Sequence, residues 1–263
     1  MGAQLRSLSS ADGHAYLWSG DPSVWAGTAP VLFPFVGKLN GDEYHFAGAR
    51  YPMEKHGFAR NQPFDLLEHT PSSVVLRLQH SPATLAVYPF PFRLDVRFSL
   101  DGNCLSAEHS VTNIGDAPCF FSLGAHPGFR CDMGDELVFS HPETPETYRL
   151  VCGSPVQTTP MLTDARVWPI TSHAFDDDAY ILVNPRSESI ELRRAHSPHH
   201  VHFFFHAPYL GIWAKPGAPY VCLEPWLGVD DFPQHDGDLT RKRGIQQLAP
   251  GETCTLTYGV QCL

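Results

Sequence analysis

The pattern that most limits the fold of this chain is a repeated alternation of apolar and polar residues over short runs. Residues 92–100 (FRLDVRFSL) and 105–112 (LSAEHSVT) are the clearest examples. A period of two places every second side chain on the same face, which is typical of a β-strand with one face buried. The sequence therefore predicts an all-β protein with mostly antiparallel strands. Further runs of this kind, some continuously apolar, cover residues 15–18, 74–78, 117–123, 190–193, 201–205, 210–213, 220–224 and 253–260.

Turn residues stand between these runs and support the same fold class. Asn40-Gly41 and residues 101–103 (DGN) predict β-hairpins, and residues 113–116 (NIGD) predict a further turn. The 21 glycines and 24 prolines, with only 17% charged residues, suit strands joined by turns better than a helical bundle. Without a heptad, repeat or linker, residues 1–263 should form a single domain. Because this length exceeds one small barrel, we expect two extended sheets packed face to face.

The charge of the chain narrows the class of partner. Its formal net charge is −10, and its largest basic cluster is residues 241–243 (RKR), which argues against nucleic acid or an anionic membrane as a partner. The first residues lack a basic region followed by an apolar run, and we find no stretch of about 18 apolar residues. We therefore expect a cytoplasmic protein, as a monomer or weak homodimer, that binds a small, polar, uncharged molecule.

The cysteines and one histidine-rich tract bear on metal binding. Seven cysteines form an odd set without a CxxC pair, so we expect reduced thiols that serve as small packing residues. Residues 196–202 (HSPHHVH) contain a possible metal tract, but on a strand His200 and His202 would point to one face and His199 to the other. We therefore expect no metal site. The seven cysteines are Cys104, Cys119, Cys131, Cys152, Cys222, Cys254 and Cys262.

Two segments place an acid–base residue at the end of a strand. Residues 122–129 (SLGAHPGF) hold His126 among glycine and proline, where it can face a ligand and transfer protons. Glu224 ends an apolar run and precedes Pro225 and Trp226, a setting that predicts a partly desolvated carboxyl with a raised pKa. The alternatives are one packed histidine among 15 and a solvated strand-end carboxylate. Trp226 is either a core residue or a platform for the apolar face of a pyranose.

Two further loops carry polar residues beside glycine. Lys38 follows an apolar run in residues 30–39, and residues 53–60 (MEKHGFAR) join His56 to Arg60 in a segment bracketed by prolines. Both cations are either surface charges or ligands of a polar substrate.

At these residues the chain resembles the aldose 1-epimerase (galactose mutarotase-like) family, and most closely its short bacterial LacX-like branch. The resemblance covers nearly the whole chain. It implies a single-domain β-supersandwich with a sugar-binding cleft on one sheet. It also implies a reaction that needs no cofactor, the interconversion of the α and β anomers of a free aldohexose. The matching segments are residues 32–39 (LFPFVGKL), 56–60 (HGFAR), 124–129 (GAHPGF), 209–219 (YLGIWAKPGAP), 224–228 (EPWLG) and 244–252 (GIQQLAPGE).

The resemblance also implies a role for each matched residue. Glu224 corresponds to the general base that takes the proton of the anomeric hydroxyl, and His126 to the general acid that protonates the ring oxygen. His56 corresponds to a second histidine that steadies the ring oxygen or a neighbouring hydroxyl. The remaining residues would bind the sugar: Arg60, Lys38, Trp226 and one member of the run Asp176, Asp177 and Asp178, of which Asp178 is our choice.

The chain departs from the family pattern at two substrate contacts. Lys38 stands where relatives commonly have arginine, and it lacks the bidentate fork of a guanidinium. Gly128 stands where an aromatic residue is frequent, which predicts a cleft that is open on that side. Two alternatives to a mutarotase follow. One is a sugar-binding or sugar-sensing protein without turnover. The other is a hexose-6-phosphate 1-epimerase, which would need a cationic pocket from Lys38, Arg60 and Lys215.

Overall fold

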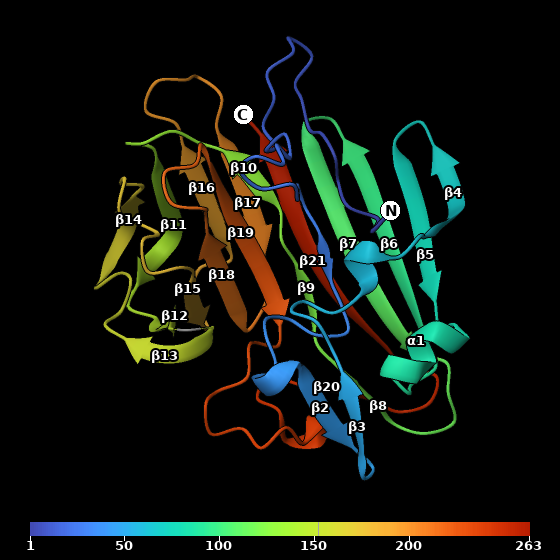
Figure 1. Ribbon diagram of the computed structural model, residues 1–263. Coiled ribbons are helices and arrows are strands. Elements are labelled where there is room, and N and C mark those ends of the chain that lie inside the picture. Colours follow the sequence, from blue (N-terminus) through green and yellow to red (C-terminus); the bar gives the residue numbers. More distant parts are fainter. Residues whose placement is uncertain (152) are drawn as a thin grey trace.

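Two large antiparallel sheets dominate the computed structural model, which describes residues 1–151 and 153–263 and so leaves Cys152 outside the described residues. In the nine-stranded sheet, every neighbouring pair of strands is antiparallel (Figure 1). Its order is β14 (Ala165–Pro169), β11 (Glu136–Glu143), β16 (Ser189–Arg193), β17 (Val201–Phe205), β21 (Thr253–Cys262), β7 (Cys104–Asn113), β6 (Phe92–Asp101), β5 (Ser73–Gln79) and β4 (Asp65–Thr70).

The eight-stranded sheet carries the two strand-end segments that hold His126 and Glu224. Its central strand β19 (Tyr220–Leu227) pairs on one side with β18 (Tyr209–Trp213) and on the other with both β9 (Leu123–Ala125) and β10 (Gly128–Arg130). The remaining strands are β1 (Val31–Leu32) beyond β9, and β15 (Tyr180–Val183), β12 (Glu146–Val151) and β13 (Ser154–Thr158) beyond β18.

Several short elements connect the large sheets, and the short strands among them lie at the bottom of Figure 1. The strands there form two small sheets, and the only α-helix among the described residues is a six-residue turn with a capping box at Ser81. No helix among the described residues has the length and apolarity needed to cross a membrane. The elements are β2 (Glu43–Phe46) with β3 (Ala49–Pro52), β8 (Cys119–Phe121) with β20 (Gln246–Leu248), α1 (Pro82–Val87), and the 3₁₀ turns η1 (Asn40–Asp42), η2 (Ala59–Asn61) and η3 (Leu239–Arg241).

The main core lies between the two large sheets. On β6 the apolar members of the alternation, such as Leu94 and Val96, are fully buried, because they face the opposite sheet. Phe129 of β10 meets Phe203 of β17 with ring centroids 5.7 Å apart, which joins the two sheets through the core. The other face of the eight-stranded sheet carries a second, smaller apolar cluster that includes Leu32 and Trp226. That face is therefore also partly covered, and it holds the site described below.

The all-β prediction is confirmed, and two local predictions are wrong. Residues 15–18 make only isolated bridges, because Gly13 and Gly20 adopt positive φ on either side and turn the backbone before a ladder can extend. Asn40-Gly41 lies in the 3₁₀ turn η1, and the hairpin nearby turns later, at residues 47–48. The hairpin predicted at residues 101–103 does join β6 to β7.

Candidate active site

His126 and Glu224 lie opposite each other across two paired strands, although they are far apart in the sequence. Gly124 of β9 pairs with Trp226, and Gly128 of β10 pairs with Cys222. In an antiparallel pair this register continues through the gap between β9 and β10 and sets His126 opposite Glu224. His126 and Pro127 occupy the gap between β9 and β10, and there the His126 side chain can reach the carboxyl group of Glu224.

The two side chains are in contact and almost completely buried. His126 Nε2 lies 3.2 Å from Glu224 Oε2, and the residues are 8% and 1% exposed. Burial raises the pKa of Glu224 well above its usual value and lowers the pKa of His126 to about 3. The close pair is not aligned as a hydrogen bond, so Glu224 Oε2 and His126 Nδ1 have no hydrogen-bond partner among the described residues. Buried polar atoms without partners are suited to a polar ligand.

His56 presents a fixed hydrogen-bond donor to the same site. The backbone N–H of Gly37 donates to His56 Nδ1 at 3.1 Å, so the neutral ring carries its proton on Nε2. Its ring stands edge-on to that of His126, with centroids 5.8 Å apart. Burial lowers the pKa of His56 well below its usual value, and the neighbouring His126 lowers it further. The next residue must be glycine, because a Cβ at Gly57 would lie 2.4 Å from the carbonyl oxygen of Phe33.

Aromatic rings enclose the acid–base pair. Trp25 stacks on His126 with ring centroids 5.0 Å apart, and Trp213 meets the same imidazole edge-on at 5.7 Å. Trp226 fits because glycines flank it on both neighbouring strands. A Cβ at Gly124 or Gly211 would come within 2.8 or 2.5 Å of its indole.

The cleft is not open at Gly128, which corrects the expectation from the sequence. A Cβ at Gly128 would lie 2.9 Å from Cζ3 of Trp25, so the indole of Trp25 already occupies the space beside this glycine. Trp25 is held by the Trp18 indole N–H, which donates to the Trp25 carbonyl oxygen at 2.8 Å. Sequence reasoning missed Trp25, because nothing in an irregular segment before the first strand marks it as a neighbour of His126.

Charged side chains complete a cavity of about 210 Å³ beside the acid–base pair. Arg60 lines it and is oriented by its donation to the Lys55 carbonyl oxygen at 2.7 Å. Of the three neighbouring aspartates only Asp178 lines the cavity, and Asp176 is exposed and paired with His173. Arg149 fixes this loop by donating to the carbonyl oxygens of residues 177 and 178. The complete lining is Trp25, Pro30, Lys55, His56, Arg60, His126, Leu150, Asp178, Ala179, Trp213, Glu224, Trp226 and Asp230.

Lys38 is the one residue of the sequence-based set that does not line this cavity. Its side chain is 44% exposed and pairs with Asp42 at 3.8 Å. Its backbone N–H, by contrast, donates to Asp230 Oδ1 at 2.7 Å and holds that carboxyl against the cavity. Lys55 and Asp230 are lining residues that sequence reasoning missed. The only available signal was that Lys55 directly precedes His56 in a segment already singled out.

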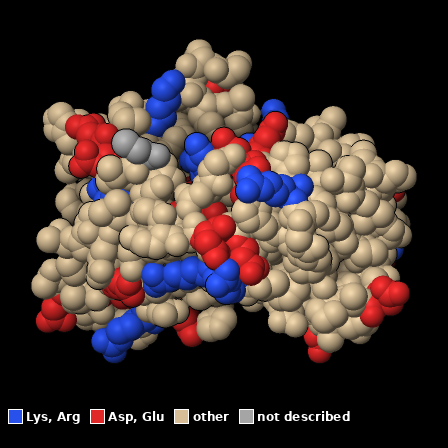
Figure 2. Space-filling model, turned by 60° about the horizontal axis from the view of Figure 1, so that its bottom comes forward, with Lys and Arg blue, Asp and Glu red and all other residues tan. Residues whose placement is uncertain are grey.

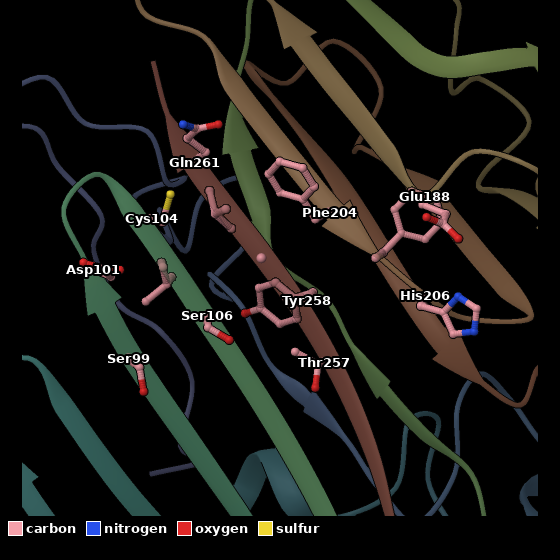
Figure 3. A pocket seen from close by; sticks show the side chains of 14 residues that line it. Ser99, Asp101, Cys104, Ser106, Glu188, Phe204, His206, Thr257, Tyr258 and Gln261 are labelled. Atoms are coloured by element: carbon pink, nitrogen blue, oxygen red, sulfur yellow. The ribbon is translucent and has the colours of Figure 1, made fainter.

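A larger hollow of about 600 Å³ lies on the outer face of the nine-stranded sheet (Figure 3). Its lining includes small side chains, such as Ser106 and Thr257, and Phe204, which is 41% exposed. This hollow is shallow and open, whereas the smaller cavity brings a buried acid, two buried histidines and three indoles together. Convergent polar groups with shifted pKa values are a better mark of an active site than volume.

The histidine tract makes separate local contacts. His199 stacks on His14 with centroids 4.0 Å apart, His200 Nδ1 accepts from the Arg194 N–H, and His202 lies 3.1 Å from Ser189 Oγ. The described cysteines are all free thiols: Cys104, Cys119, Cys131, Cys222, Cys254 and Cys262.

Comparisons with known proteins bear on the family and the fold of the chain. A family model described as aldose 1-epimerase matches residues 1–261. The plasmid-encoded protein LacX of Lactococcus lactis subsp. lactis is 30% identical over 285 residues, which cover 100% of this chain and 94% of LacX.

Two solved structures are similar over the whole chain. The galactose mutarotase related enzyme from Lactobacillus acidophilus is 32% identical with a TM-score of 0.94, covering 100% of this chain and 92% of that one. A galactose mutarotase-like protein from Lactobacillus casei is 30% identical with a TM-score of 0.92, covering 100% and 94%. The chain therefore belongs to the aldose 1-epimerase family and has the galactose mutarotase-like fold.

Proposed function

We propose that this protein is an aldose 1-epimerase that interconverts the α and β anomers of an uncharged aldohexose. The observation that carries the proposal is the contact between His126 and Glu224 at the cavity, with the two atoms 3.2 Å apart. A protein that only binds sugar needs hydrogen-bonding groups but no matched acid and base. Both groups are buried, so their proton transfers take place largely out of water.

The catalytic pair works with one shared proton. Burial raises the pKa of Glu224 and lowers that of His126, so without sugar this proton resides on Glu224. The cationic Lys55 lowers the pKa of Glu224, and a sugar hydroxyl that donates to the carboxylate acts in the same direction. Sugar binding thus favours the state in which Glu224 is the base and His126 carries the proton.

The reaction then follows as two reciprocal proton transfers. Glu224 takes the proton of the anomeric hydroxyl while His126 gives its proton to the ring oxygen, and the bond between C1 and the ring oxygen breaks to leave an aldehyde. Rotation about the C1–C2 bond presents the other face of the aldehyde. On closure, His126 takes back the proton of the attacking hydroxyl and Glu224 returns its proton to the former carbonyl oxygen. General acid–base catalysis of this kind contributes about 10²–10⁴-fold in rate.

The remaining lining residues hold the sugar in place. His56 Nε2–H is a fixed donor for the ring oxygen or a neighbouring hydroxyl, since Gly37 occupies its other nitrogen. Arg60 donates to hydroxyls and Asp178 accepts from them, and their positions on the lining support these roles. Trp25 and Trp226 line the cavity and supply apolar surface beside the pyranose ring.

The charges around the cavity favour an uncharged sugar over a sugar phosphate. Of the three cations that the sequence offered for a phosphate pocket, only Arg60 lines the cavity, where Lys55 is a second cation. Lys38 pairs with Asp42, and Lys215 Nζ donates to the carbonyl oxygen of Val24 at 3.2 Å. The lining also includes Asp178 and Asp230, which would repel a phosphate.

We propose a sugar as the ligand, no cofactor, and a cytoplasmic monomer or weak homodimer. The net charge of −10 and the interspersed acidic and basic side chains on the face drawn in Figure 2 support a small ligand over nucleic acid or a membrane.

Polarimetry tests the proposal directly. Freshly dissolved α-D-glucose and α-D-galactose should reach their equilibrium rotation faster with the protein than without it, and glucose 6-phosphate should respond less. The matched control is the Glu224→Gln variant at equal concentration. If the protein bound galactose yet left the spontaneous rate unchanged, it would be a sugar-binding protein, and the mutarotase assignment would fail.

A further inference from the structure

Cys222 is a buried thiol beside the acid–base pair that the proposed reaction does not use. It precedes Glu224 by two residues on β19, so the pleat of the strand directs both side chains to the same face of the sheet. Across the ladder its partner is Gly128, where a Cβ would lie 3.4 Å from Cys222 Sγ and 2.9 Å from Trp25. The thiol is fully buried, and both it and the Trp25 indole lie close to the same point beside Gly128.

Three potential metal ligands converge there. A nitrogen of His126, Sγ of Cys222 and a carboxylate oxygen of Glu224 all lie within 4.8 Å of one another. Nowhere else in residues 1–151 and 153–263 do three histidine, cysteine or acidic donors come together in this way. The separation of 3.2 Å between His126 Nε2 and Glu224 Oε2 fits the edge of a tetrahedron, which is about 3.3 Å for bonds of about 2.0 Å.

The state of these donors points to a ligand. Glu224 is 1% exposed, yet its Oε2 has no hydrogen-bond partner within the described part of the chain. A buried, unsatisfied carboxyl oxygen is costly, and a cation beside it would remove that cost. His126 and Glu224 line the cavity and Cys222 does not, so the side of the triad that remains for a fourth ligand is the cavity. Three protein ligands with one open position form a common zinc site, and thiolate with imidazole favours zinc over magnesium or calcium.

We propose that His126, Cys222 and Glu224 bind a thiophilic divalent cation such as Zn²⁺, and that the bound ion reversibly switches the site off. Binding releases the thiol proton of Cys222 and the shared proton of the pair to solvent. The ion then occupies the carboxylate and the imidazole that the sugar needs, so metal and sugar exclude each other. This inhibitory effect rests on the proposed mutarotase function, whereas the metal site itself does not.

Titration of the reduced protein with Co²⁺ and Zn²⁺ tests the site. Co²⁺ should give a sulfur-to-cobalt charge-transfer band in the near ultraviolet, and Zn²⁺ should abolish it. In polarimetry Zn²⁺ should slow mutarotation, and a higher galactose concentration should raise the zinc concentration needed. A wild-type protein that shows no band and no inhibition overturns the proposal. A band without inhibition overturns the switch.

The decisive variant is Cys222→Ala, with Cys119→Ala as the matched control at another buried cysteine. Cys222→Ala should keep the basal rate, lose the band and need at least about tenfold more zinc for inhibition, whereas Cys119→Ala should behave like the wild type. Cys222→Ser serves the same purpose if the alanine variant folds poorly. Equal zinc sensitivity in the Cys222 and Cys119 variants refutes the site. A band in a protein without basal mutarotation would refute the proposed function alone.

Discussion

Replacement of Glu224 by glutamine should lower kcat, retain sugar binding and raise the stability of the protein near neutral pH. Glutamine keeps the shape of the side chain and one carbonyl acceptor, but it cannot take a proton at neutral pH. Glu224 is 1% exposed, so water has little access to substitute for the lost base. We expect kcat to fall by about 10²–10⁴-fold, which corresponds to about 2.7–5.4 kcal/mol at about 1.36 kcal/mol per decade.

The same substitution should stabilise the protein near neutral pH. Burial raises the pKa of Glu224 above its usual value of 4.5, so the folded state holds a proton that the unfolded state releases. Its contribution to stability is therefore present below pH 4.5 and is lost as the pH rises toward the folded pKa. Glutamine does not titrate, so the melting temperature of the variant should exceed that of the wild type at pH 7, and the difference should shrink toward pH 4.5.

Three measurements on one preparation check this reasoning. Polarimetry across a range of galactose concentrations gives kcat and KM, tryptophan fluorescence reports sugar binding next to Trp25 and Trp226, and calorimetry at several pH values gives the melting temperature. His126→Asn should also lower kcat, because asparagine cannot supply the proton to the ring oxygen. A Glu224→Gln protein that equilibrates anomers as fast as the wild type would remove Glu224 from the role of base. A loss of binding in parallel with rate would instead make Glu224 a sugar ligand.

Four other perturbations have defined outcomes. Arg60→Ala should raise KM about 5–13-fold, as expected for a lost hydrogen bond of about 1–1.5 kcal/mol, and leave kcat within about twofold by polarimetry. Gly211→Ala places a Cβ 2.5 Å from Trp226 and should cost about 1–3 kcal/mol in urea unfolding. Gly259→Ala on β21, whose Cβ would lie 3.5 Å from its nearest neighbour, is the control, and equal costs would contradict the packing argument. Burial lowers the pKa of His109 to about 4, so stability should be lost as the pH falls from 6.5 toward 4, by up to about 3 kcal/mol, and His109→Phe should flatten that dependence in urea titrations. EDTA should not lower the mutarotation rate, and activity that disappears with the chelator and returns with zinc would show a metal-dependent enzyme instead.

The alternation of side chains predicts the strands because it reflects burial, which is local information. Residues 92–100 and 105–112 are strands with one buried face, as their pattern indicates. The pairing of strands is different, because it depends on contacts between distant segments. Nothing in the local sequence states that β9 and β10 share β19 as a partner, yet that register is what sets His126 opposite Glu224.

The same distinction between local information and contacts of distant segments applies to the candidate site residues. His126 and Glu224 could be identified because turn residues or proline sit next to them at the end of an apolar run. The sequence could not show that Lys55 lines the cavity and Lys38 does not, since each is a lysine in a loop segment beside the site. The backbone decides between them: the Lys38 N–H turns toward Asp230 and the cavity, while the side chain lies at the surface beside Asp42.

The exchange at Gly128 shows why a single position cannot predict the shape of a cleft. Loss of an aromatic side chain at that position should open the site if all other residues stayed in place. Here an indole from a distant segment, Trp25, fills the space and stacks on His126. The glycine is then required, since any side chain at residue 128 would collide with Trp25. Cys222 Sγ would lie 3.4 Å from a Cβ at this position, so the glycine leaves room both for the indole and for a buried thiol near the acid–base pair.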